Sequence, residues 1–126
     1  MRRRGEGDEG QAAVELALVL PLVVVLLLAV VQVGLLVRDH VRLVHAAREA
    51  ARQAAVDVTT DAPRRAAEAS SGLDGRRLEV TVSGRGAAGS RVTVALRYHA
   101  GGQVPLIGAA VHHVTLEATA TMRVEH

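Results

Sequence analysis

The sequence predicts an α+β protein in which a long N-terminal transmembrane helix extends into a small domain with a three-stranded antiparallel sheet. Three observations predict this fold class. An apolar run, residues 16–37, carries no charged or polar side chain before Gln32. After Arg38, small and apolar residues recur at helical spacing. Beyond Gly75, three segments instead alternate apolar with polar residues, which is the pattern of strands with one buried face.

These segments divide the 126 residues into four parts. We expect a cytoplasmic leader at 1–10, a transmembrane helix at 11–37, an amphipathic continuation at 38–58 and a small extracytoplasmic α+β domain at 59–126. The leader is charged and rich in glycine, so we expect it to be unstructured. The domain has a thin core, because Ala, Val and Leu supply its apolar side chains and Tyr98 is the only aromatic residue.

The apolar run is long enough to cross a membrane. At about 1.5 Å per residue, a helix over residues 16–37 matches a hydrocarbon core of roughly 30 Å. A buried soluble helix fits less well, since the remaining chain is too short to cover it on every face. A cleaved secretory signal also fits less well, because its apolar region is about 7–15 residues. Residues 2–4 are arginines, which favours a single-pass plasma membrane protein with a cytoplasmic N-terminus and an extracytoplasmic C-terminal domain.

Glu15 places a carboxylate at the entry to the apolar run. On its own it is explained as a first-turn acid that the helix dipole favours near the headgroups. Its spacing from Gly10 suggests a second role. Cleavage after Gly10 would make Gln11 the first residue, and Glu15 could then pair with the new α-amino group of a neighbouring subunit. Such a pair would neutralise both charges within an apolar bundle and set the register between helices.

Pro21 lies inside the apolar run. It removes one backbone donor, so we expect a kink or a locally loosened turn in the helix. A flexible helix could slide and pack during extraction from the membrane. Equally, membrane helices tolerate proline without any such role.

The residues around Gly10 and Glu15 carry a resemblance to a known family. The sequence GQAAVELALVLPL at 10–22 resembles the opening of the TadE-like pseudopilins of tight-adherence (Flp) pilus systems. AAREAAR at 46–52 and ATATMRVE at 118–125 are similar to later parts of that family. The resemblance implies cleavage between Gly10 and Gln11 by a prepilin peptidase, a role for Glu15 in assembly, and other pilin or pseudopilin subunits as partners. Leu16 departs from the aromatic residue that often follows the glutamate.

The helix is predicted to continue beyond Arg38. One stripe of it is small and apolar: Val37, Val41, Val44, Ala47, Ala51, Ala54 and Val58. This stripe would pack either on the protein's own β domain or on another subunit. His40 and His45 are five residues apart, which is not the spacing of a helical metal pair, and we expect both to be solvated.

The remaining elements are short. Thr60 or Asp61 would cap a second helix with Pro63 in its first turn, ending at Gly72. Strands are predicted at 78–83, at 92–98 and at about 113–125, with the first two forming a hairpin. A loop from Gly101 to Gly108 would fold Val104, Leu106 and Ile107 back over the core.

The sequence offers little basis for catalysis or for binding of a cofactor. There is no cysteine, and His112 and His113 would point to opposite faces of a strand, so no metal site is predicted. The glycine-rich segment 84–89 lacks the context of a phosphate loop. The arginines are spread along the chain without aromatic neighbours, which disfavours nucleic-acid binding. We therefore expect neither an enzyme nor a cofactor.

Two functions remain from different classes. The first is a pilin-like minor subunit that assists assembly or initiation of a tight-adherence pilus. The alternative is an uncleaved single-pass anchor that carries a small extracytoplasmic binding module. A pseudopilin of type II secretion is supported by the same physical arguments as the pilin-like subunit. Only the family resemblance disfavours it.

Overall fold

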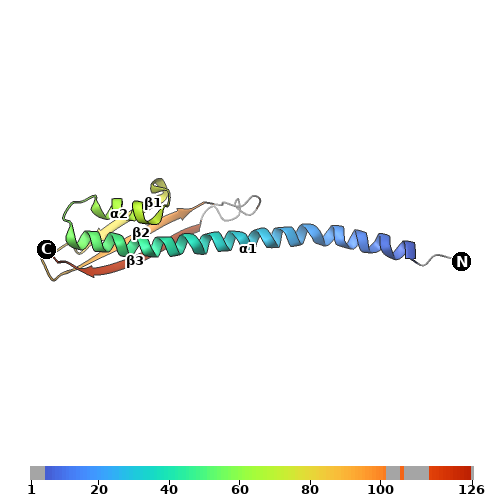
Figure 1. The fold of residues 1–126 in the computed structure, drawn as a ribbon, viewed down its shortest axis with the longest axis horizontal. Helices are drawn as coiled ribbons and strands as arrows, with labels where there is room; N and C mark the ends of the chain where they lie inside the picture. The colour runs from blue at the N-terminus through green and yellow to red at the C-terminus, as the bar shows by residue number, and fades with distance from the viewer. Residues whose placement is uncertain (1–4, 102–105, 107–113, 126) are drawn as a thin grey trace.

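The computed structural model describes residues 5–101, 106 and 114–125. Along the chain, its elements are α1 (Gly5–Val56), α2 (Ala62–Ser71), the short 3-10 helix η1 (Gly75–Arg77), β1 (Leu78–Ser83), β2 (Arg91–Ala100) and β3 (Val114–Arg123). Figure 1 shows the N-terminal half of α1 projecting from the small domain, with its C-terminal half beside the sheet. The predicted α+β fold class is confirmed.

The three strands form one antiparallel sheet in the order β1-β2-β3. The register pairs Leu78 with Tyr98 and Leu96 with Ala118, so apolar residues of neighbouring strands share one face. Along β2, the side chains of Val92, Val94, Leu96 and Tyr98 are all buried. The predicted alternation of apolar and polar residues therefore places the core between the sheet and α1.

The part of α1 that packs on the domain is lined by small side chains. Its buried residues include Leu43 and six alanines: Ala46, Ala47, Ala50, Ala51, Ala54 and Ala55. Because alanine adds so little bulk, the backbone of α1 can approach the sheet and α2 closely. Of the two packing partners predicted for this part of the helix, its own domain is the one observed.

The predicted apolar stripe is displaced around the helix in part. Val37, Val41 and Val58 are exposed, while Asp39 and Leu43 are buried. The predicted stripe was chosen from apolar and small residues alone. It therefore left out the helix face that contains the buried acidic residue Asp39. The buried face of α1 contains Asp39 and Leu43 instead of Val37 and Val41, and it includes the predicted stripe residues from Ala47 to Ala54.

Helix α2 begins and ends close to its predicted limits. Pro63 lies in its first turn, and Gly72 ends it with a φ of 65° in the left-handed region. Asp61 is the N-cap residue, but its side chain makes no capping hydrogen bond. In the connection between β1 and β2, Gly84 has a φ of 76°, and a Cβ there would collide with the carbonyl oxygen of Arg91. Glycine is therefore required at the end of β1.

The end of the domain far from the apolar run is held by contacts between three segments. The Arg85 guanidinium donates hydrogen bonds to the carbonyl oxygens of Asp57, Val58 and Thr59 at 3.0–3.4 Å, just beyond the C-terminus of α1. The backbone N–H of Glu125 donates to the carbonyl oxygen of Ala55 at 3.1 Å. A positive charge at this point also complements the helix dipole of α1.

Two predictions were wrong, one for the N-terminal leader and one for the loop between β2 and β3. Residues 5–10 are helical rather than unstructured, so α1 begins within the predicted leader. Asp8 and Glu9 favour a helix there, because the dipole attracts acids in the first turns. Leu106 is 76% exposed and does not cover the core. Val104, Ile107, His112 and His113 lie outside the described residues.

Candidate functional site

The N-terminal half of α1 presents apolar side chains on all sides. Its most apolar 18-residue window has a mean hydropathy of 3.0, and none of that window is buried. Leu18, for example, is 74% exposed. A core helix of a soluble domain would instead be covered by its own chain. One helix that is long, apolar and uncovered indicates a single-pass membrane protein.

The predicted processing and assembly residues lie at the start of this apolar segment. Gly10, Gln11 and Glu15 are all exposed on α1. A Cβ added at Gly10 would meet no atom within 4 Å. Gln11 and Glu15 are four residues apart, so they lie on the same side of the helix, one turn from each other. The helix continues without interruption through Pro21.

Two polar residues of α1 that the sequence interpretation gave no role are buried. Gln32 is 2% exposed and Asp39 is 1% exposed, whereas Val33 is 59% exposed. Their spacing of seven residues, with Leu36 and Leu43 between and after them, places them on one face of the helix. The helical spacing of these four residues could have predicted this buried face from the sequence. It was missed because Gln32 and Asp39 are polar, and polar residues are not expected in a core.

The family comparison covers this same helix. Residues 10–52 match the family model described as TadE-like protein. The N-terminal part of the chain is TadE-like. The resemblance seen at 10–22 and at 46–52 is thereby confirmed, while the similar segment at 118–125 lies beyond the match. No curated protein and no solved structure matches the chain.

The TadE-like segment lies wholly within α1. It contains the exposed apolar run and most of the alanine-rich part that packs on the domain. The match therefore ends before α2 and the sheet begin. One continuous helix therefore contains both the exposed apolar run and the part that packs on the domain.

Where the domain meets the TadE-like helix, Tyr98 on β2 is buried close to charged groups. Burial raises the pKa of the Tyr98 phenol, and the negative charge of Asp39 on α1 raises it further. The positive charge of Arg77 lowers the pKa of Tyr98. The negative charge of Asp74 raises this pKa, whereas a hydrogen bond with the Asp74 backbone lowers it. Leu78, which directly follows η1, pairs with Tyr98, so η1 lies beside the end of β2.

We expect alkaline pH to destabilise the domain through Tyr98. Because the folded pKa is raised, the phenol stabilises the fold fully below its unfolded pKa of about 10, and this contribution is lost as pH rises through the folded pKa. Tyr98 is the only tyrosine, so tyrosinate absorbance of the full chain in detergent reports its pKa directly. The variant Tyr98→Phe should lose this part of the pH dependence. A titration at or below pH 10 in the folded protein would contradict the prediction.

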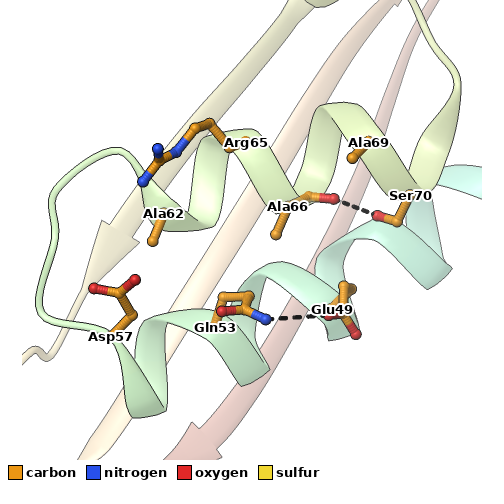
Figure 2. A pocket seen from close by; sticks show the side chains of 8 residues that line it. All are labelled: Glu49, Gln53, Asp57, Ala62, Arg65, Ala66, Ala69 and Ser70. Carbon is orange, nitrogen blue, oxygen red and sulfur yellow. Dashed lines mark hydrogen bonds between the residues drawn. The ribbon is translucent and has the colours of Figure 1, made fainter.

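A hollow of about 530 Å³ lies on the other side of the domain, between α1 and α2. Figure 2 shows Glu49 and Gln53 on α1 below, and Ala62, Ala66 and Ala69 on α2 above. The Arg52 guanidinium, 2.5 Å from Glu49, holds the pKa of that carboxyl below its ordinary value. The Ser70 hydroxyl donates to the carbonyl oxygen of Ala66 at 2.6 Å. These groups form their contacts within their own helices.

The outer face of the sheet carries paired polar side chains. Arg97 donates to Glu117 at 3.0 Å, and His99 is 3.2 Å from Glu79. Thr93 and Thr121 share a hydrogen bond of 2.9 Å. Among the described residues, no group of three or more His, Cys, Asp or Glu is placed to hold a metal ion. These pairs link neighbouring strands across the sheet.

Proposed function

We propose that this protein is a pilin-like minor subunit, a pseudopilin, that assists assembly or initiation of a tight-adherence pilus. In this proposal α1 inserts the protein into the plasma membrane with its N-terminus in the cytoplasm and its domain outside. A prepilin peptidase removes residues 1–10. The protein acts by packing against other pilin or pseudopilin subunits, and not as an enzyme.

One observation carries the proposal: the TadE-like match begins at Gly10, the residue before the predicted cleavage site, and stays within a single helix. That helix exposes its apolar residues on every side up to Leu27. Exposure of this kind supports packing first against lipid and then against other helices. The exposed position of Glu15 leaves its carboxylate accessible to an α-amino group of a neighbouring subunit.

The first experiment is a measurement of the intact mass and N-terminal residue of the protein purified from membranes of its own host. We expect a chain that begins at Gln11. Protein from cells without the peptidase is the control and should retain residues 2–10. A chain that keeps these residues in cells with an active peptidase would contradict processing and would favour the uncleaved anchor with a binding module.

A further inference from the structure

The apolar run and the folded domain are joined without a spacer. The run ends at Val37, and Asp39, two residues later, is already buried. The covered face reaches back to Gln32, which at about 1.5 Å per residue is about 9 Å before Arg38. Because α1 is continuous from Gly5 to Val56, the domain cannot move away from the bilayer on a flexible link. One end of the domain therefore stays close to the lipid headgroups, while the tilt of α1 still decides which side of that end meets them.

Exposed arginines gather at that end. Arg38 and Arg42 lie on α1 one turn apart, and Arg76 and Arg77 form the end of η1. Helix η1 lies toward the apolar run, because Leu78, which directly follows it, pairs with Tyr98 near the end of β2, whereas the connection that precedes β2 contacts the C-terminus of α1 through Arg85. Figure 1 shows the segment between α2 and β1 at the ends of these two elements that are nearer the projecting half of α1. We call these four arginines the juxtamembrane basic patch.

Two acids lie near this patch, and only one of them forms an ion pair with an arginine of the patch. The Asp39 carboxylate, 3.7 Å from Arg38, is buried against the domain. The Asp74 carboxylate accepts a hydrogen bond from the backbone N–H of Arg76 at 3.0 Å and so caps η1. Within the described part of the chain, Arg42, Arg76 and Arg77 form no ion pair. Three guanidinium groups therefore remain available to an external anion.

Local structure holds Arg77 in this position. Its guanidinium lies against Gly101, just after the end of β2, where a Cβ would collide with its Nη1 atom. The backbone N–H of Arg77 also donates to the carbonyl oxygen of Asp74 at 3.0 Å. The side chain is thus placed at the headgroup level by a turn and a glycine, so little ordering is needed before it meets an anion.

We propose that the juxtamembrane basic patch binds the phosphates of anionic lipids and docks the domain on the membrane surface in one orientation. The inference rests on the membrane span of the proposed function and not on pilus assembly. Guanidinium groups match phosphate geometry with paired hydrogen bonds. Docking would fix which side of the domain faces away from the lipid, and hence which surfaces a neighbouring subunit can reach.

The test uses the full chain in lipid nanodiscs of phosphatidylcholine, with or without phosphatidylglycerol. The chain has no cysteine, so Ser70→Cys near η1 and Ala88→Cys at the opposite end each give a single labelling site. Quenching of a neutral fluorophore by lipids with a headgroup nitroxide measures its distance from the surface. We expect the anionic lipid to increase quenching at position 70 and to leave position 88 unchanged.

The variant R76Q/R77Q should lower the ratio of docked to undocked protein by about thirtyfold in anionic discs. The matched control is R91Q/R123Q, which removes the same charge from an exposed pair that faces across β2 and β3. This control should leave quenching at position 70 unchanged. Equal effects of the two variants, or equal quenching in both lipids, would overturn the proposal. An increase in quenching at position 70 when inorganic phosphate is added to discs without phosphatidylglycerol, at constant ionic strength, would also overturn it, because a small anion would then act without the anionic lipid.

The same preparation separates this proposal from the membrane span. A chain that fails to elute with the discs would contradict the span itself. A chain that elutes with the discs and shows no dependence on lipid charge would contradict only the docking of the basic patch.

Discussion

Replacement of Gly10 by alanine is expected to abolish removal of residues 1–10 and, with it, assembly of the protein into a pilus. The reason is recognition by the peptidase and not folding. A Cβ at Gly10 meets no atom within 4 Å, and alanine favours a helix over glycine by about 1 kcal/mol. The measurement is the intact mass of the membrane-bound protein together with a count of surface pili.

The matched control for this variant is Gly7→Ala. It makes the same substitution three residues earlier in the same helix, and a Cβ there also meets no atom within 4 Å. Both variants stiffen the start of α1 equally, and a peptidase needs this backbone to open locally. Gly7→Ala should therefore be processed. If it were blocked to the same degree as Gly10→Ala, helix opening rather than the residue before the cleaved bond would be the cause.

Replacement of Leu43 by alanine is expected to unfold a large fraction of the domain. Leu43 is fully buried and is among the largest side chains of a core made mainly of alanine and valine. Removing such a side chain costs about 2–5 kcal/mol, which is comparable with the whole stability of a small domain. Urea unfolding of the full chain in detergent measures this loss. Tyr98, the only aromatic residue, provides the fluorescence signal.

Val41→Ala is the control on the opposite side of α1. Val41 is 49% exposed, so its truncation should cost less than 1 kcal/mol. The pair of variants tests which face of the helix packs on the domain. A cost at Val41 equal to that at Leu43 would restore the apolar stripe predicted from the sequence and contradict the face that the structure shows.

The elements of secondary structure were predictable because their signals are local. Period-two alternation over 78–83 and 92–98 marked two strands, and Pro63 and Gly72 marked the limits of α2. The extent of α1 at its N-terminus was not predicted. Glycines at 5, 7 and 10 suggested disorder, but helical hydrogen bonds propagate outward from the long run that follows.

Some residues of the candidate site were also predicted from the sequence, and others were not. Gly10, Gln11 and Glu15 were predicted from their spacing and the family resemblance, and Pro21 was noted as a proline within the apolar run. The structure adds that the first three are exposed. The burial of Gln32 and Asp39 and the surroundings of Tyr98 were not identified. Whether a polar residue is buried depends on which face of the helix the rest of the chain covers, and residues distant in sequence supply that cover.

The sequence by itself determined the membrane-spanning helix, the TadE-like resemblance and the three strands, because each is carried by residues adjacent along the chain. Only the tertiary structure decided how these parts meet. It buried Asp39 against the domain, placed η1 beside the end of β2 and left no spacer between the apolar run and the domain. The physical reason is that close packing of an alanine-rich helix on a sheet selects one face among several of similar composition, and that choice depends on shape across the whole interface.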